Sequence, residues 1–365
     1  MGEDFFRYLP SEIVLDILSR LPTQDAMACK CVCKPWLVLL ATPEFVNFHL
    51  SRSVPGIVVE THSTRSYDVI EAFNSDEEHF RDVTFNFKLP FDEPIHSSAD
   101  GLIFLKDDDF GDLILCNPIT RDYIKLPFPP QTTSAEELEM DTFGFGVSRT
   151  TGQYKAVRVF EQDRLPFECQ VYTVGTGLWR KVPSDSLLSF FYHHKMVLLN
   201  GNLHLMALEM TIDGMVEHIS CLDLETEVFS TFSIPDPEGL GFSYCRMASV
   251  FRDCLCLSHI TADGEIVIWL MKEYGDDNSW VREVFVCEVA GGFFNESHVW
   301  PIRVFENGDI LMECDGKPFY YSKKTKTFDY DTAFRGDRFS YISMTIYTSS
   351  FVSLKNFAME NVSSF

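Results

Sequence analysis

The sequence contains no run of about twenty consecutive apolar residues, so no membrane-spanning helix is expected. Its N-terminus is acidic and polar, without a basic region leading into an apolar one, which argues against a signal peptide. Basic residues are scarce: the chain has 30 Lys and Arg but 54 Asp and Glu, which gives a formal net charge of −24. The electrostatic field of so acidic a protein repels nucleic acid and anionic membranes, so neither is expected as a partner.

The short motifs of common catalytic and nucleotide-binding sites are also missing. The chain has no Gly-x-Gly-x-x-Gly, Gly-x-x-x-x-Gly-Lys-Ser/Thr, Gly-x-Ser-x-Gly or His-Glu-x-x-His. His193 and His194 are adjacent, so on a strand they would point to opposite faces. The acidic run at residues 107–109 lacks the spaced ligands and closing Glu of a calcium loop. We therefore expect no intrinsic enzyme activity and no cofactor.

The eleven cysteines are an odd number, and most lie in apolar, strand-like runs such as those at Cys221 and Cys256. Buried free thiols in a reducing compartment explain them best, so we expect a cytoplasmic protein, with the nucleus as a possible additional location. Cys29-x-Cys31-x-Cys33 does not predict a metal site, because on a helix Cys31 would face away from the other two. No Cys-x-x-Cys or His-x-x-x-His pattern follows it.

The first fifty residues have helical periodicity. Pro10 and Ser11 start a helix whose apolar face is Ile13, Val14, Ile17, Leu18 and Leu21, and Pro22 ends it. Thr23 is placed to cap a second helix over residues 24–32, and a third is broken at Pro35. Thr42, Pro43 and Glu44 open a fourth. So small a unit cannot bury all its apolar residues by itself, so one face packs on the rest of the chain or binds a partner.

Three stretches of this segment form a recognisable motif: Leu9-Pro10-x-Glu12-Ile13-x-x-x-Ile17-Leu18-x-Arg20-Leu21-Pro22, Cys31-Val32-Cys33-Lys34-x-Trp36-x-x-Leu39 and Pro43-x-Phe45. Together they resemble an F-box. The resemblance implies that the chain binds a Skp-type adaptor and, with a cullin, forms an SCF ubiquitin ligase in which other subunits perform the covalent step. The adaptor-binding residues that it implies are Leu9, Pro10, Ile13, Ile17, Leu18, Leu21, Pro22, Val32 and Trp36.

After residue 50 the periodicity changes from helical to that of strands, with short β-branched runs separated by turns. A polar turn that leads into an aromatic residue recurs every 48–56 residues. These aromatics are Tyr67, Tyr123, Trp179, Phe229, Trp280 and Phe328. A period near fifty favours four-stranded propeller blades of kelch type, about six in number. The run at residues 344–347 could supply the strand that closes the ring, and a sandwich or split barrel is the alternative.

Five stretches of this second part form recognisable motifs: Asp100-Gly101-Leu102-Ile103, Leu115-Cys116-Asn117-Pro118-Ile119-Thr120-Arg121, Phe143-Gly144-Phe145-Gly146, Tyr154-Lys155-Ala156-Val157-Arg158 and Ile268-Trp269-Leu270-Met271. Together they resemble the F-box-associated domain of plant F-box proteins. The family includes immune regulators and the pollen S-locus F-box proteins, whose clients are basic ribonucleases. The first 50 residues carry a charge of −2, so −22 belongs to the remainder, and this acidic balance suits a basic client.

The matched motifs have structural explanations as turns and closely packed strands, so the loops between strands are the candidate client site. The residues singled out there are Asp107, Asp108, Asp109, Phe110, Phe191, Tyr192, Phe293 and Phe294. For each of these aromatics, burial inside the propeller is the alternative.

The sequence thus predicts an α+β protein of two domains: a small helical F-box at residues 1–50, and a mainly-β, kelch-like propeller at residues 51–365. Its expected function is to recognise a protein client for ubiquitination and proteasomal degradation. Two alternatives stay open. One is a propeller enzyme or small-ligand sensor whose helices form only a cap, which needs convergent polar residues in the central channel. The other is an F-box protein that binds the adaptor without ubiquitinating a client.

Overall fold

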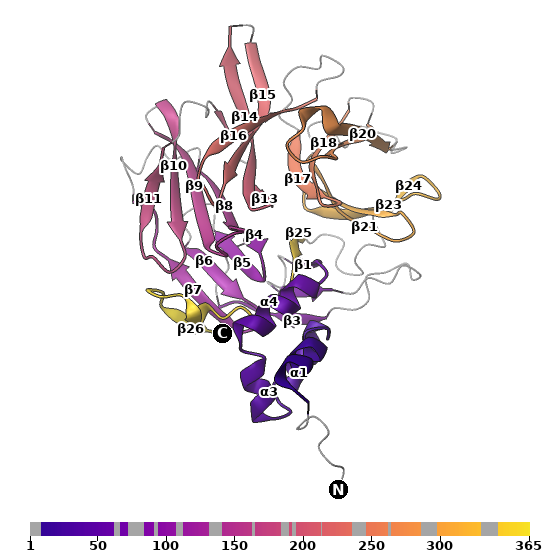
Figure 1. Cartoon of the computed structure of the whole chain (residues 1–365). Helices are drawn as coiled ribbons and strands as arrows, with labels where there is room; N and C mark the ends of the chain where they lie inside the picture. The colour runs from indigo at the N-terminus through magenta and orange to yellow at the C-terminus, as the bar shows by residue number, and fades with distance from the viewer. Residues whose placement is uncertain are drawn as a thin grey trace.

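The computed structural model describes the helical module, six sheets and most of the turns between strands (Figure 1). The described residues are 9–61, 66–71, 84–90, 94–106, 112–130, 141–162, 165–183, 190–191, 195–212, 214–235, 246–261, 264–285, 298–329 and 342–365.

The N-terminal module consists of helices α1 (Ser11–Leu18), α2 (Thr23–Cys29), α3 (Lys34–Leu39) and α4 (Pro43–Arg52). Pro35 was predicted to break the third helix, but it lies in the first turn of α3, where a missing N–H costs no hydrogen bond. The fourth helix begins where the sequence predicts, and the side chain of Thr42 caps it by accepting a 3.3 Å hydrogen bond from the amide of Phe45. Thr23 does not cap α2; Pro22 is at that position.

The module packs on the propeller through a core that both parts share. Val14, Leu15, Leu18, Ala26, Leu40 and Phe45 of the helices form one cluster with Ile119 and Phe351 of the propeller. The rings of Phe45 and Phe351 lie edge to face, with centroids 5.4 Å apart. One face of the module is therefore covered by the rest of the chain.

The strands form six sheets, which are the blades of a β-propeller. Blade 1 contains β25 (Ile342–Tyr347), β1 (Gly56–Thr61), β2 (Ser66–Ile70) and β3 (Phe85–Phe87). Blade 2 contains β4 (Ile95–Ala99), β5 (Leu102–Lys106), β6 (Leu113–Asn117), β7 (Asp122–Leu126) and β26 (Val362–Ser364). Blade 3 contains β8 (Asp141–Val147), β9 (Tyr154–Gln162), β10 (Leu165–Thr173) and β11 (Trp179–Val182).

The second half of the ring is built in the same way. Blade 4 contains β12 (Phe190–Phe191), β13 (Val197–Leu199), β14 (Asn202–Thr211), β15 (Gly214–Asp223) and β16 (Phe229–Ser233). Blade 5 contains β17 (Met247–Phe251), β18 (Cys254–Ile260), β19 (Ile266–Met271) and β20 (Trp280–Phe285), with the 3-10 turn η2 (Asp277–Ser279) before β20. Blade 6 contains β21 (Val299–Val304), β22 (Ile310–Cys314), β23 (Lys317–Ser322) and β24 (Thr327–Asp329).

The C-terminal segment closes the ring, as the sequence predicts. Strand β25 pairs antiparallel with β1, and Val58 lies opposite Thr345 in that register. The chain then passes through the 3-10 turn η3 (Leu354–Asn356), and β26 adds to the edge of blade 2. The ends of the propeller domain are thus held by backbone hydrogen bonds in two neighbouring blades.

The aromatic repeat marks the fourth strand, counted from the inner edge, in five of the six blades, at β7, β11, β16, β20 and β24. Tyr67 is the exception, because it lies on β2, which is the third strand of blade 1. In blade 1 the repeat therefore falls one strand earlier than in the other blades. The inner strand of this blade, β25, comes from the far end of the chain.

The glycines of β8 allow neighbouring blades to approach closely. A Cβ at Gly144 would lie 2.6 Å from Sδ of Met196, and one at Gly146 would lie 2.6 Å from a methyl group of Leu198. The turn after β6 is also as predicted: Oδ1 of Asn117 accepts from the amide of Ile119 at 2.9 Å. Both motifs position strands rather than a ligand.

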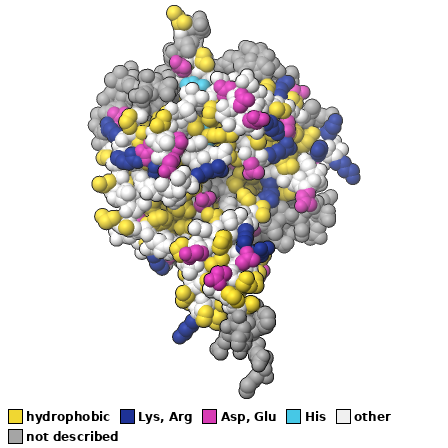
Figure 2. All heavy atoms as spheres, viewed as in Figure 1, with side chains coloured by type: hydrophobic (Ala, Val, Ile, Leu, Met, Phe, Trp, Pro, Cys, Tyr) yellow, Lys and Arg dark blue, Asp and Glu magenta, His cyan; other side chains and the backbone are white. Residues whose placement is uncertain are grey.

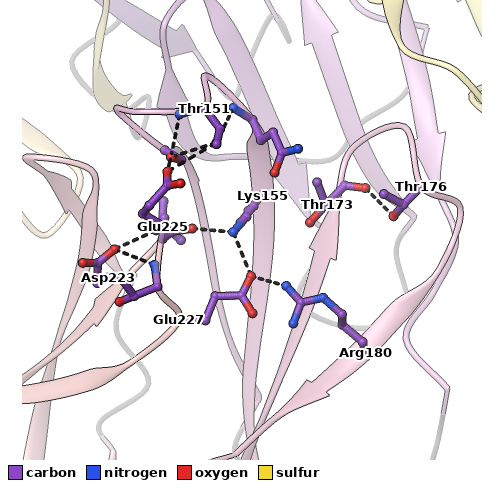
Figure 3. Close-up of polar contacts among 12 residues, drawn as sticks. Thr151, Lys155, Thr173, Thr176, Arg180, Asp223, Glu225 and Glu227 are labelled. Atoms are coloured by element: carbon purple, nitrogen blue, oxygen red, sulfur yellow. Dashed lines mark hydrogen bonds and ion pairs between the residues drawn. The ribbon is translucent and has the colours of Figure 1, made fainter.

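Blades 3 and 4 are joined by a polar cluster (Figure 3). Nζ of Lys155 lies 2.7 Å from Oε1 of Glu227, which also accepts from Arg180. Burial acts to raise the pKa of Glu227, but its hydrogen bonds with Arg180 and Lys155 outweigh burial and lower it. Glu225 accepts from Ser148 in the same cluster.

Candidate functional site

The helical module has an apolar surface that the propeller does not cover. It consists of the exposed residues Pro10, Ile13, Ile17, Val32, Leu37 and Val38, which we call the module surface. Ile13 and Ile17 are one helical turn apart on α1, and their side chains are 48% and 41% exposed. In Figure 2 hydrophobic atoms reach the surface of the module, at the end of the molecule away from the β14–β15 hairpin.

The other predicted adaptor-binding residues divide by burial. Pro22 is exposed, whereas Leu9, Leu21 and Trp36 are half-buried against the module core. Leu18 does not lie on the surface: it is only 2% exposed, because its side chain fills the core between the helices. Leu37 and Val38 belong to the surface although they were not singled out, since the second turn of α3 leaves both outside the core.

A charged cluster borders α1. Oδ1 of Asp16 lies 2.6 Å from Arg52 of α4, and Oδ2 lies 3.1 Å from Arg20. The hydrogen bonds from Arg20 and Arg52 lower the pKa of the Asp16 carboxyl. The cluster joins the first and last helices of the module, and so fixes the helix that carries Ile13 and Ile17.

The predicted client-binding residues are not tested by the structure. Asp107, Asp108, Asp109, Phe110, Tyr192, Phe293 and Phe294 lie outside the described residues. Of Phe191 only the backbone is described, in β12, where it lies opposite Ala207.

The propeller has a cavity of about 540 Å³ along its axis, lined by strands β4, β13, β17, β21 and β25. Its titratable lining residues are His96, Asp100, Lys195 and Glu313. Burial raises the pKa of Glu313 to about 7, and burial together with the charges of Lys195 and Lys106 lowers the pKa of His96 well below its usual value. The sequence patterns did not predict this group of residues, because its members come from segments far apart in the sequence and only the closed ring brings them together.

One cluster has the composition of a cysteine nucleophile with its base. Sγ of Cys221 lies 3.5 Å from Nε2 of His204, which also lies 2.8 Å from the hydroxyl of Tyr274. However, burial raises the pKa of Cys221 and lowers that of His204 to about 4. Both groups are therefore neutral at pH 7, which suits a core hydrogen bond and not a thiolate nucleophile.

Within the described part of the chain, no three His, Cys, Asp or Glu side chains converge in a way that could hold a metal ion. No described helix has the length and apolar character that crossing a membrane requires. The nine described cysteines are all free, and those at Cys116, Cys169, Cys221, Cys256 and Cys314 are buried in strands.

A helical module with an uncovered apolar surface, packed on a six-bladed propeller, defines a protein of two structural parts. The F-box associated beta propeller domain family matches residues 53–345, and an F-box-like family matches residues 6–47. The chain therefore belongs to the F-box proteins that carry an F-box-associated β-propeller.

Curated relatives from Arabidopsis thaliana align with most of this chain. F-box protein CPR1 is 26% identical over 87% of this chain and 84% of its own. F-box protein At3g07870 is 26% identical over 84% and 82%, and F-box/kelch-repeat protein At3g23880 is 22% identical over 86% and 90%. Among solved structures, YjhT matches with a TM-score of 0.39 and 12% identity over 73% of this chain and 90% of its own, too weak a likeness to carry an argument.

Proposed function

We propose that this chain is the substrate-recognition subunit of an SCF-type ubiquitin ligase. The observation that carries the proposal is the module surface, where Ile13 and Ile17 remain exposed although other apolar residues of the same helices are buried against the propeller. An apolar surface of this kind is unfavourable in water and suits a protein partner. The partner is a Skp-type adaptor, which in turn binds a cullin.

The propeller presents the client. The covalent chemistry belongs to other subunits, and this chain contributes proximity by holding client lysines near the loaded ubiquitin carrier. The net charge of −22 after residue 50 would speed association with a basic client, including one of the ribonuclease type. The place of action is the cytoplasm, with the nucleus as a possible additional location.

Co-purification from plant cells tests this function with the full chain. The variants are wild type, the double variant Ile13→Asp/Ile17→Asp, and Leu178→Asp as the control, because Leu178 is 75% exposed on the propeller. We expect the double variant to lose adaptor and cullin while keeping client proteins, and the control to keep all of them. Adaptor recovered equally with the double variant would contradict the proposal.

A further inference from the structure

We propose that the axial cavity is a binding site for a small amphipathic organic carboxylate, with its carboxylate at Lys195 and its apolar body along the channel. The inference is independent of the proposed ligase role, because the cavity lies within the propeller and contains no residue of the module surface.

The size of the cavity suits a ligand rather than one or two waters. Its volume of about 540 Å³ lies within the roughly 300–1,000 Å³ of small-molecule sites. The apolar lining includes Met247, Ile302 and Ile346 from three different blades, and Trp300 adds an aromatic face. These side chains offer a flat organic group an apolar channel with an aromatic wall.

Several polar groups of the lining lie near Lys195, whose charge acts on both His96 and Glu313. Nζ of Lys195 donates to the carbonyl of Ile95 at 3.1 Å, and Oε2 of Glu313 accepts from the amide of Met344 at 3.1 Å. Nδ1 of His96 and Oγ of Ser97 are buried, and neither has a hydrogen-bond partner in the described part of the chain. Buried polar atoms are normally satisfied, so these two atoms mark unpaired polar groups in the wall of the cavity, behind its accessible surface.

The charges favour an anionic head. Lys195 lines the cavity, and Lys106 is close enough that both charges lower the pKa of His96. Glu313 opposes an anion only in part, because its pKa near 7 leaves it substantially protonated at neutral pH and able to donate. Asp100 also lines the cavity, in the turn that follows β4, and burial raises the pKa of its carboxyl. A cationic head would instead meet repulsion from Lys195.

The test measures binding of three naphthalene probes to the full chain by calorimetry: 2-naphthoate, 2-naphthalenemethanol and 2-naphthylmethylammonium. They share one apolar body and differ in head charge. We expect naphthoate to bind at least 10-fold more tightly than the ammonium probe. In Lys195→Met this preference should be lost through at least 10-fold weaker naphthoate binding, while Lys195→Arg should retain most of it.

A second variant separates the cavity from other surfaces. Ala248 lines the channel, so Ala248→Phe should fill it and abolish binding of all three probes, with thermal unfolding recorded to show that the variant is folded. Three results would overturn the inference: no naphthoate binding to wild type at millimolar concentration, equal affinity for all three heads, or naphthoate affinity unchanged in both Lys195→Met and Ala248→Phe. Adaptor binding by the same variants is measured separately, so that failure here does not bear on the ligase role.

Discussion

The hydroxyl of Thr23 donates a 2.8 Å hydrogen bond to Oε1 of Glu71, which joins helix α2 of the module to the residue that follows β2 of blade 1. Thr23 is buried, so this bond forms where water does not compete for it. Together with the Phe45–Phe351 contact, this hydrogen bond fixes the orientation of the propeller relative to the helical module. Geometry of this kind matters if the chain is to present a client at a fixed position.

Thr23→Val should therefore lower stability to urea by about 1–2 kcal/mol, because it keeps the shape of the side chain but leaves Glu71 without its donor. Thr176→Val is the control, since its hydroxyl bonds only within an exposed turn and should change stability by less than about 0.5 kcal/mol. Equal effects of the two substitutions would show that the bond does not hold the module.

Gly101→Ala should be far more damaging than Gly152→Ala. Both glycines have positive φ, at +89° and +66°, but a Cβ at Gly101 would lie 2.1 Å from Cβ of Ser350, whereas nothing lies within 4 Å of one at Gly152. We expect a loss of about 1 kcal/mol at Gly152 from backbone strain alone, and of about 2–4 kcal/mol at Gly101. Thermal unfolding of the two variants checks the difference, and similar losses would argue against close packing of the C-terminal segment.

The ion pair between blades 3 and 4 gives a third prediction. Lys155→Met should cost about 2–4 kcal/mol, because Glu227 is largely buried and keeps only the half-exposed Arg180. Lys181→Met removes an exposed pair with Glu168 and should cost less than about 1 kcal/mol. Urea unfolding measures both. If the double variant Lys155→Met/Glu227→Leu were no more stable than Lys155→Met, the loss would not come from an unpaired buried carboxylate.

Glu313 makes stability depend on pH. Its pKa is raised by burial from 4.5 to about 7, although Lys195 and the amides of Met344 and Gly316 lower it, and Asp315 raises it further. At Glu313 the folded chain then binds more protons than the unfolded chain between these pH values, so the contribution of Glu313 to the free energy of unfolding should fall as pH rises through this window. The loss is on the order of 1–3 kcal/mol.

Glu313→Gln should flatten this pH dependence, and unfolding at pH 5, 6, 7 and 8 measures it. Glu273→Gln, on the exposed turn before β20, is the matched control and should leave the slope as it is in wild type. A slope that survives in Glu313→Gln would assign it to another group.

The fold was largely predictable because it depends on local patterns. The start of α4 at Thr42 and Pro43, the glycines of β8 and the aromatic residue on the fourth strand of five blades act within a few residues of their own position. The phase of blade 1 could not be predicted, since β25 comes from more than 280 residues beyond β1. The burial of Leu18 could not be predicted either. The helix that contains it has one buried and one exposed apolar face, and periodicity does not show which face a partner covers.

The cavity could not be predicted from the sequence, because its polar residues come together only through long-range contacts. His96, Lys195 and Glu313 lie in three blades, and each is an unremarkable polar residue in its own stretch. Only the closed ring places them together. The client loops stay a prediction, because the residues singled out there lie outside the described part of the chain.

The affinity of a purified Skp-type adaptor for the full chain tests the central claim most directly. The comparison is between wild type, Ile13→Asp/Ile17→Asp and Leu178→Asp, with circular dichroism to show that all three are folded. The account predicts that wild type and Leu178→Asp bind alike, and that the double variant binds at least about 100-fold more weakly, as expected when central apolar contacts are lost. Undiminished binding by a folded double variant, or no binding by wild type, would contradict it.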